Sequence, residues 1–255
     1  MKPARMQKAA IPKPIQKTSG ISGRETIGRG GFEPGERGTG RVGRDGPPAG
    51  ASGYPGAVKL LAFSDLHRDL DQAERLVEMS AEADLVIGAG DFASVHEGLE
   101  ETIGALAAIE TPTVLVPGNN ETEEELRAAA SSWSAATVLH GDGTTVDGVD
   151  VYGLGAGIPV TPWDWSFDLD EESAKEMLAA CPESAVLVLH SPPHGHCDSG
   201  GGGDHFGSKA LLEAIEAKRP RLAVCGHIHE SWGCQSQIDD TPLHNLGPKG
   251  AWLEA

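Results

Sequence analysis

From residue 57 onward the sequence predicts an α/β fold. Short runs rich in β-branched and aliphatic residues alternate with amphipathic segments that have the spacing of a helix. Short polar segments follow directly after several of the apolar runs, as they do where strands end at one edge of a parallel sheet. These observations predict β-α-β units with chemically active side chains at the strand ends.

The expected elements follow one another along the chain. Three strand and helix pairs come first, and each forms a crossover unit. Shorter β-prone stretches separated by Gly-Asp turns are then typical of a meander. An irregular segment, residues 155–167, is expected to be an ordered surface loop that borders a site. The expected strands are 58–63, 85–87, 113–116, 137–139, 144–146, 149–154, 185–189 and 221–225, and the expected helices are 70–81, 97–109, 122–130, 168–180 and 208–218.

The charge is unevenly distributed along the chain. The formal net charge is −18, although residues 1–50 carry ten Lys and Arg against four Asp and Glu. The rest of the chain is therefore strongly acidic, which repels polyanions and argues against stable binding of nucleic acid. Such a composition is typical of an ordinary acidic enzyme or of a protein from a salt-loving organism, where high ionic strength screens the charges.

Residues 1–56 are rich in Gly, Pro and basic side chains and contain one aromatic residue before Tyr54, namely Phe32. This composition predicts a disordered, solvated tail. A nucleic-acid-binding arm is an alternative, but interleaved aromatic residues are missing. A start codon assigned too far upstream in the gene would also add an N-terminal stretch of this kind. Residues 57–255 have no internal repeat and no second core, so we expect them to form one domain.

The cysteine pattern and the hydropathy indicate a cytoplasmic protein. No apolar stretch approaches the ~18–20 residues of a membrane span, and the basic N-terminus lacks the apolar block of a secretory signal. No membrane association is expected. The four cysteines form no C-x-x-C pair, so we expect reduced thiols. These residues are Cys181, Cys197, Cys225 and Cys234.

Five polar signatures follow expected strands. Asp65 and His67 can aim a carboxylate and an imidazole at one point, and the two oxygens of Asp91 can serve two cations. Asn119 offers a neutral amide oxygen. Each residue taken alone is also explained as a turn former, a helix cap or a core histidine, but together at one sheet edge they predict a two-metal site. The signatures are Asp65-Leu66-His67, Gly90-Asp91, Gly118-Asn119, His190 and Gly226-His227-Ile228-His229.

The last signature places two histidines two residues apart. On an extended segment, His227 and His229 would face the same way, whereas Ile228 would point into the core. Together with His190, these make three histidines at strand ends, which packing alone explains poorly.

The five signatures resemble those of the calcineurin-like metallophosphoesterase family, which are D-x-H, G-D, G-N-H-[DE], a lone His after a strand, and G-H-x-H. The resemblance covers residues 58–255. Residues 191–195 and 205–208 are also similar to segments of small single-domain members. The resemblance implies a four-layer αββα sandwich, in which two mixed sheets are flanked by helices. It further implies hydrolysis of phosphate esters by a hydroxide that two divalent metal ions activate.

Position by position, the resemblance implies seven metal ligands. One metal would be held by Asp65, His67, Asp91 and His229, and the other by Asp91, Asn119, His190 and His227. Mixed oxygen and imidazole ligands favour Mn²⁺, with Fe, Zn²⁺ or Co²⁺ as alternatives, over Ca²⁺ or Mg²⁺.

The third signature departs from the family pattern. It continues as Asn120-Glu121, so the histidine expected to protonate the leaving group is absent, and Asn120 cannot be a general acid. The resemblance implies that some small members without this histidine remain active, often on phosphodiesters or activated esters, and we expect a small phosphodiester as substrate. His205 is our first candidate for the proton donor, followed by His194, His96 and His196.

Other interpretations stay open. The chain can be a metal-binding scaffold for protein interaction that has lost catalysis, or a nuclease that acts on DNA ends. Residues 194–197, His-Gly-His-Cys, resemble a separate zinc site but lack a second ligand pair. Residues 200–203, four glycines, lack the Lys-Ser/Thr of a phosphate-binding loop and are expected to form a flexible loop at the rim of the site.

Overall fold

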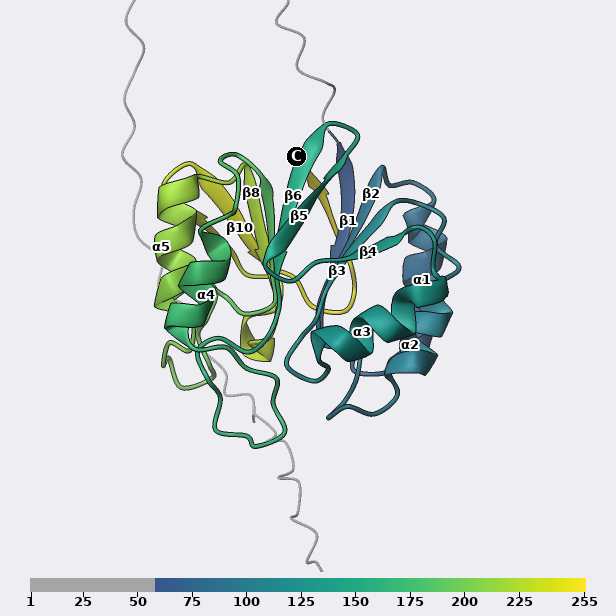
Figure 1. The fold of residues 1–255 in the computed structure, drawn as a ribbon, viewed down its shortest axis with the longest axis horizontal. Coiled ribbons are helices and arrows are strands. Elements are labelled where there is room, and N and C mark those ends of the chain that lie inside the picture. Colours follow the sequence, from purple (N-terminus) through teal and green to yellow (C-terminus); the bar gives the residue numbers. More distant parts are fainter. Residues whose placement is uncertain (1–57) are drawn as a thin grey trace, which may run out of the picture. The chain divides into compact units, whose positions relative to one another are not determined.

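The computed structural model describes residues 58–255, which belong to one compact unit. These residues form two mixed β-sheets with helices on their outer faces, which confirms the predicted fold class (Figure 1). The tail expected at residues 1–56 lies outside the described residues. Its disorder and the domain boundary therefore stay predictions.

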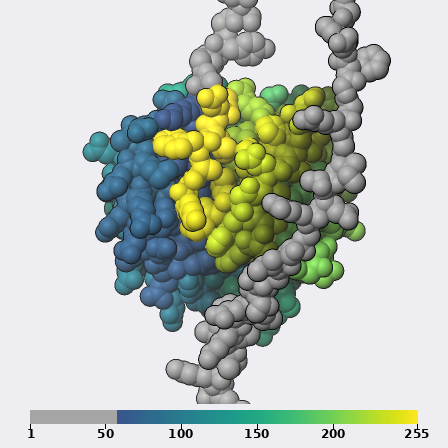
Figure 2. All heavy atoms as spheres, turned by 180° about the vertical axis from the view of Figure 1, so that it is seen from behind, coloured from purple at the N-terminus to yellow at the C-terminus, as the bar shows by residue number. Residues whose placement is uncertain are grey.

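The first sheet has five strands and carries three α-helices. Its elements are β1 (Lys59–Phe63), α1 (Leu70–Ser80), β2 (Leu85–Ala89), α2 (Leu99–Leu106), β3 (Thr113–Val116), α3 (Glu123–Ala129), η1 (Ala130–Ser132), β4 (Ala136–Val138) and β11 (Ala251–Glu254). The strand order is β11-β1-β2-β3-β4, and β1 to β4 are parallel, as the three β-α-β units require. β11 pairs antiparallel with β1, so the C-terminal residues lie at the surface beside the first strand (Figure 2).

The second sheet has six strands and carries two α-helices. Its elements are β5 (Asp142–Val146), β6 (Val149–Leu154), α4 (Glu171–Leu178), β7 (Val186–Leu189), α5 (Lys209–Lys218), β8 (Leu222–Cys225), η2 (His229–Ser231), β9 (Gln235–Ile238) and β10 (Thr241–Asn245). The strand order is β5-β6-β7-β8-β10-β9. The four central strands are parallel, and the two edge strands run antiparallel to their neighbours.

Alternating side chains of the buried strands fill three apolar layers. Leu61 of β1 packs among residues of α1, α2 and α3, whereas its neighbour Leu60 packs with Val186 of β7 between the sheets. On the far side, Leu187 packs with residues of α4 and α5. Because successive strand side chains point to opposite faces, each central strand is covered on both sides. The result is the order helices, sheet, sheet, helices that the resemblance implied (Figure 1).

Polar caps set where the helices begin. The Thr122 and Glu125 side chains form a capping box at α3, and the Asp170 carboxylate accepts from the Ser173 N–H at α4. The helix expected at 168–180 therefore begins three residues late, at Glu171, whereas the one expected at 97–109 begins two residues late, at Leu99, after Gly98 in a left-handed conformation. No helix of residues 58–255 combines the length and apolarity needed to cross a bilayer.

The predicted meander at residues 137–154 is wrong in part. β5 and β6 do form an antiparallel hairpin in the second sheet, but β4 pairs with β3 and completes the first sheet. A strand of three residues is too short for its sequence to indicate which strand it pairs with. β4 follows α3 in the chain, and it forms the fourth parallel strand of the first sheet. β9, β10 and β11 were not predicted, because all three are short and β9 and β10 are mostly polar.

The expectation of reduced thiols is wrong for one pair of cysteines. Cys197 and Cys234 form a disulfide, whereas Cys181 and Cys225 are free and buried. The pair is 37 residues apart in sequence, so no local motif reveals it. The two cysteines meet because the loop after β7 packs against the segment between β8 and β9. Since disulfides persist mainly in oxidising environments, the expected cytoplasmic location stays a prediction.

Candidate metal centre

The five signatures lie together at the C-terminal edge of the parallel strands. They occupy the loops that follow β1, β2 and β3 in the first sheet and β7 and β8 in the second, at the lower edge in Figure 1. We call these loops the signature loops; they are residues 64–69, 90–98, 117–122, 190–208 and 226–234. Because the two sheets face each other, the edge gathers side chains from both halves of the domain.

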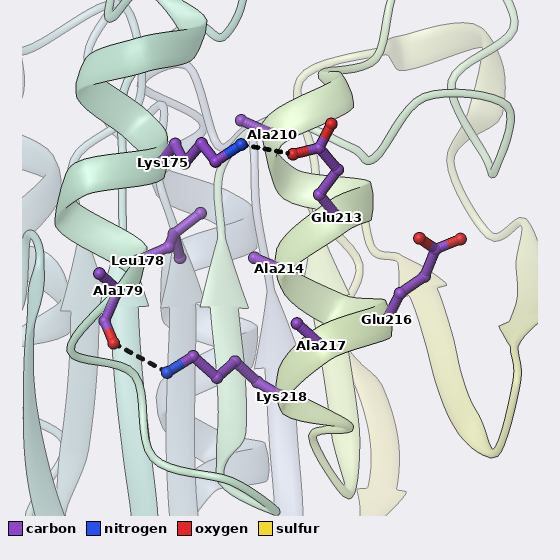
Figure 3. Close-up of a pocket in the computed structure, with 9 residues that line it drawn as sticks. All are labelled: Lys175, Leu178, Ala179, Ala210, Glu213, Ala214, Glu216, Ala217 and Lys218. Atoms are coloured by element: carbon purple, nitrogen blue, oxygen red, sulfur yellow. Dashed lines mark hydrogen bonds and ion pairs between the residues drawn. The ribbon is translucent and has the colours of Figure 1, made fainter.

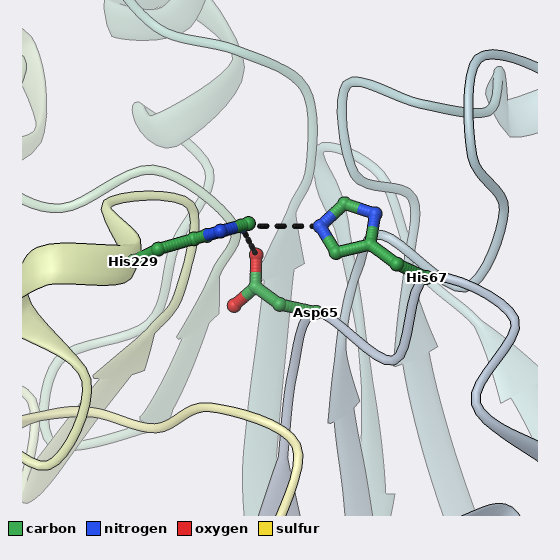
Figure 4. Close-up of side chains that lie close together, drawn as sticks. All are labelled: Asp65, His67 and His229. Carbon is green, nitrogen blue, oxygen red and sulfur yellow. Dashed lines mark hydrogen bonds and ion pairs between the residues drawn. The ribbon is translucent and has the colours of Figure 1, made fainter. Parts of the chain in front are cut away.

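Three side chains form the first cluster. The ligand-type atoms of Asp65, His67 and His229 all lie within 4.8 Å of one another (Figure 4). The Nε2 atoms of the two histidines are 3.1 Å apart, and the His229 Nε2 is 3.6 Å from the Asp65 Oδ1. A carboxylate and two imidazoles thus converge on one point from β1 and from η2, although 162 residues separate the two histidines.

Three further side chains form the second cluster, again with ligand-type atoms within 4.8 Å of one another: Asp91, His190 and His227. The Asn119 amide lies against this cluster. Its Oδ1 is 3.3 Å from the His190 Nε2 and 3.1 Å from the His227 Nδ1. All seven residues singled out from the sequence therefore meet at one edge of the domain.

The Asp91 carboxylate lies between the two clusters. Its Oδ2 is 3.5 Å from the His67 Nε2, and its Oδ1 is 3.4 Å from the His190 Nε2. One oxygen thus faces each cluster. A carboxylate in this position is able to bridge two cations.

Backbone carbonyls hold two of the histidines in the tautomer that a metal needs. The His67 Nδ1–H donates to the Ala93 carbonyl (3.1 Å), and the His190 Nδ1–H donates to the Ala89 carbonyl (2.8 Å). The Nε2 lone pair of each ring is therefore left facing its cluster. Neither carbonyl is visible as a signal in the sequence.

The backbone of the site adopts left-handed conformations that side chains rarely take. Asp65, His67, Asp91 and His227 have φ angles of 55°, 44°, 58° and 67°. Such strain persists only where the surrounding structure holds it, and it concentrates at functional sites. Gly90 also has a positive φ, and a Cβ there would lie 2.6 Å from the His190 Nδ1.

The prediction of an extended segment at residues 227–229 is wrong. His227 is left-handed and His229 begins the 3₁₀-helix η2, so the chain turns between the two imidazoles. Ile228 is only partly buried and does not belong to the core. This turn is what sends the two histidines to different clusters.

Glu121 is a functional-site residue that the sequence reasoning missed. Its carboxylate is fully buried and accepts from the N–H groups of Asp91 (2.8 Å), Gly118 (2.6 Å) and Ala93 (2.9 Å). It thereby ties the loops after β2 and β3 together under the site. The signal was available, because Glu121 occupies the acidic fourth position of the third signature.

Asn120 holds Asp91 in place. Its backbone N–H donates to the Asp91 Oδ1 (2.9 Å) and its Nδ2 donates to the Asp91 Oδ2 (2.7 Å). Its own Oδ1 accepts from the Val95 N–H (2.8 Å). The residue that replaces the expected histidine is thus an orienting group for the carboxylate between the clusters.

The irregular segment 155–167 borders the site, as predicted. The Asn119 Nδ2 donates to the Ser166 Oγ (2.8 Å), and this hydroxyl donates to the Asp168 carboxylate (2.7 Å). The Phe167 N–H donates to the Asn119 carbonyl (3.0 Å). These contacts orient the Asn119 Oδ1 toward the second cluster.

Charges in the site shift the pKa values of its groups. Burial alone would raise the pKa of Asp65, but the close His229 imidazole and the charge of His190 hold it below its ordinary value. Asp65 in turn raises the pKa of His229. Burial, followed by the charge of His190, lowers the pKa of His227 to about 3, so this imidazole is neutral, which is the form that binds a metal.

Two buried carboxylates of the site carry raised pKa values. Burial is the main cause for both Asp91 and Glu121; the charge of Asp65 adds to the effect for Asp91, and the charge of Asp91 adds to it for Glu121. Buried carboxylates this close together repel one another, and a bound cation would relieve the repulsion. Together with the imidazoles, these oxygens form a donor set that fits divalent metal ions of the Mn²⁺ to Zn²⁺ series.

His205 is not part of either cluster. Its Nδ1–H donates to the Asp198 Oδ1 (2.6 Å), and the other oxygen of this buried carboxylate accepts from the N–H groups of Gly195 and Gly207, both at 2.9 Å. His205 pairs with Ser199, whose carbonyl accepts from a hydroxyl of η2, the helix that begins with His229. The sequence reasoning missed Asp198.

Of the alternative proton donors, His194 is also accessible, with a side chain that is 40% exposed, whereas His96 and His196 are held by other groups. Both ring nitrogens of His96 have partners, namely the Glu125 carboxylate (2.9 Å) and the Trp165 carbonyl (2.7 Å). The His196 Nδ1 is 2.8 Å from the Ser236 hydroxyl. The zinc alternative at residues 194–197 is ruled out for Cys197, because its sulfur is part of the disulfide. Residues 200–203 form the tip of the hairpin that carries His205.

A surface groove of about 680 Å³ lies elsewhere, between α4 and α5 (Figure 3). Its walls are mostly alanine and the stems of longer side chains. An ion pair between the Lys175 Nζ and the Glu213 Oε2 (2.9 Å) spans it. None of the seven clustered residues lines this groove, so it is separate from the candidate metal centre.

Comparison with known proteins shows the family and agrees with the fold. A sequence model described as calcineurin-like phosphoesterase matches residues 58–231, and the chain belongs to this family. The metallophosphoesterase domain-containing protein 1 of Homo sapiens is 27% identical over 222 residues, which cover 73% of this chain and 65% of that protein. The UPF0046 protein K07C11.7 of Caenorhabditis elegans is 26% identical over 216 residues, or 76% of this chain and 70% of that protein.

Solved structures share the architecture. The protein TT1561 of Thermus thermophilus superposes with a TM-score of 0.63 at 16% identity, covering 78% of this chain and 98% of that one. A dimetal phosphatase from Danio rerio superposes with a TM-score of 0.53 at 12% identity, covering 75% and 88%. With the family match and the two clusters, the chain is a metal-dependent phosphoesterase with candidate ligand groups for divalent ions.

Proposed function

We propose that this protein hydrolyses phosphodiesters with two divalent cations, of which Mn²⁺ suits the site best. The observation that carries the proposal is the Asp91 carboxylate, which presents one oxygen to each of two carboxylate and histidine clusters. Such a pair of clusters suits a two-metal hydrolase better than a binding scaffold. The substrate is a small soluble ester, in keeping with the acidic composition of the domain.

The proposed ligands divide between the clusters. One cation is held by Asp65, His67, Asp91 and His229, and the other by Asp91, Asn119, His190 and His227. When bound, the two cations supply Lewis acidity, which acidifies the attacking water and neutralises charge on the phosphoryl oxygens. Glu121 and Asn120 keep the shared carboxylate at the centre of this arrangement.

The charge of the rim supports a diester over a monoester. The signature loops contain one Lys or Arg, Arg68, and its guanidinium lies 3.5 Å from the Glu97 carboxylate. With no other cationic side chain in these loops, a doubly charged monoester has little to balance its second charge, whereas a diester carries only one. The same acidic surface disfavours long nucleic acids.

His205 is the proposed proton donor for the leaving group. Its Nδ1–H is bound by Asp198, so its Nε2 is the nitrogen that faces away from this carboxylate. The side chain is 48% exposed and therefore accessible to a substrate at the rim. A buried carboxylate that orients an exposed imidazole is the arrangement that acid–base catalysis by histidine uses.

A screen of esters tests the function. We expect the Mn²⁺-loaded protein to hydrolyse bis-p-nitrophenyl phosphate with a higher kcat/KM than p-nitrophenyl phosphate. Asp91→Asn should lower the diesterase rate at least about 10³-fold, because the metals supply several kcal/mol of transition-state stabilisation. Asp239→Asn, at an exposed aspartate in the turn between β9 and β10, should leave the rate unchanged. No turnover of either ester would favour the scaffold alternative, and a monoester preference would overturn the diester proposal.

The proton donor is tested by varying the leaving group. His205→Gln should lower kcat about 10²-fold for an alkyl phosphodiester, whose leaving group needs a proton, and only slightly for a nitrophenyl ester, which leaves without one. His196→Gln, in the same loop, is the matched control. Equal losses for both esters would assign His205 to binding, and a loss confined to His196→Gln would move the acid to that residue.

A further inference from the structure

Trp232 touches two members of the first cluster at once. Its indole N–H donates to the Asp65 Oδ2 (3.2 Å). Its ring lies against the His229 imidazole, with 4.3 Å between the ring centroids and an angle of 32° between the planes. Asp65 follows β1 and His229 begins η2, so Trp232 connects two segments that are far apart in the sequence.

The contacts around Asp65 show what the indole does there. The Asp65 Oδ2 also accepts from the Ser64 hydroxyl, and the His227 N–H reaches both carboxylate oxygens at 3.1 and 3.2 Å. With Oδ2 held by the indole and the hydroxyl, Oδ1 is the oxygen that remains directed at His229, 3.6 Å away. Trp232 therefore fixes which carboxylate oxygen faces the cluster.

The backbone makes room for this indole. Gly247 has a φ of 94°, and a Cβ there would lie 2.9 Å from the Cγ of Trp232. The Gly247 N–H also donates to the Ser64 Oγ (2.9 Å), the hydroxyl that binds Asp65. Trp232, Ser64 and Gly247 thus form one packed support beneath the first cluster.

We infer that Trp232 is a positioning residue that sets the divalent-cation affinity of the Asp65, His67 and His229 cluster. The indole N–H and the ring contact Asp65 and His229 of the first cluster, whereas the second cluster meets Asp65 through the backbone N–H of His227 and not through its imidazole, so we expect the ligand side chains of the second cluster to stay in place. The inference rests on the proposed function only in that the same clusters bind cations. Its test measures cation binding and needs no catalytic turnover.

The indole is also a built-in reporter of cation binding. Trp232 is 38% exposed and lies within hydrogen-bonding distance of a proposed ligand. A cation bound by Asp65 and His229 changes the electric field at the ring. We expect Mn²⁺ to change the tryptophan fluorescence of the full-length protein, and we expect this change to disappear when Trp232 is replaced.

The experiment titrates the metal-free protein with Mn²⁺ alone and follows heat release, free Mn²⁺ and fluorescence. Trp232→Phe keeps the aromatic packing and removes the N–H. We expect one of two binding steps to weaken about tenfold, as is typical for loss of a partner of a metal ligand, and the other to stay unchanged. Trp252→Phe on β11, at a residue of similar exposure, is the matched control and should change neither step nor the Mn²⁺-dependent fluorescence.

Three results would overturn the inference: two unchanged binding steps in Trp232→Phe, equal weakening of both steps with a lower Tm of the metal-free protein, or no Mn²⁺ binding by the parent protein. A parent protein that binds two Mn²⁺ ions with the expected selectivity but hydrolyses no ester would support the inference and reject the proposed function. The two claims therefore fail separately.

Discussion

The two clusters offer the same chemistry in different surroundings. In the first cluster the side chains of His67 and His229 are 26% and 47% exposed around a buried Asp65, whereas in the second His190 is 0% exposed and His227 is partly buried. The second cluster is thus the more enclosed of the two, and the first is more open to solvent. Similar ligand sets can therefore differ in how firmly they hold a cation and how quickly they exchange it.

The supports of the clusters differ as well. In the second, the imidazole of His190 follows a buried strand directly and is fixed by the Ala89 carbonyl. In the first, His229 stands on a short 3₁₀-helix and relies on the flanking Trp232 ring. The core thus preorganises one cluster, and side-chain packing at the surface organises the other.

The largest expected difference concerns stability. His190→Ala should lower the free energy of unfolding of the metal-free protein by about 3 kcal/mol, because it leaves a core cavity and an unpaired Ala89 carbonyl. His229→Ala, at a half-exposed side chain, should change it by less than about 0.5 kcal/mol. Urea unfolding measures both. Equal losses would show that burial does not distinguish the two clusters.

The two clusters should release their cations at different rates when metal is removed. With a chelator in excess, the cation of the exposed first cluster should leave at least about tenfold faster than that of the enclosed second cluster, since the surrounding shell controls solvent access. Stopped-flow detection of released Mn²⁺ should then show two phases. A single phase accounting for both ions would contradict the contrast between the clusters.

The smallest expected effect is a pH dependence at His96, which ties the loop beside the second cluster to α3. Burial lowers the pKa of His96, but its bonds to the Trp165 carbonyl and Glu125, helped by the charge of Glu121, raise it above the ordinary value. The stabilisation is thus full below about pH 6.5 and is lost as the pH rises through the raised pKa.

His96→Gln should accordingly cost less than about 1 kcal/mol of unfolding free energy at pH 5.5 and still less at pH 9. Urea unfolding at both pH values measures the difference. A penalty that grows with pH would show that the charged form of His96 is not the stabilising one.

Much of the first sheet was predictable, because local sequence patterns indicate its helices and most of its strands. The runs before Asp65, Asp91 and Asn119 are short, apolar and followed by helices, so their parallel arrangement and the common edge followed from general rules of α/β folds. The second sheet was harder to predict. β9 is a short polar edge strand, β10 beside it is also mostly polar, and β4 joins the first sheet although its three residues give no sign of this.

The sequence by itself determined the α/β class, the family resemblance and the seven residues that meet at the sheet edge, because strand ends and residue types are local properties. Tertiary structure decided which cluster is buried, the Cys197–Cys234 disulfide, and the supporting roles of Glu121, Asp198 and Trp232. These features depend on contacts between segments that are distant in the chain. No local pattern encodes such contacts, since they arise only when the two sheets pack face to face.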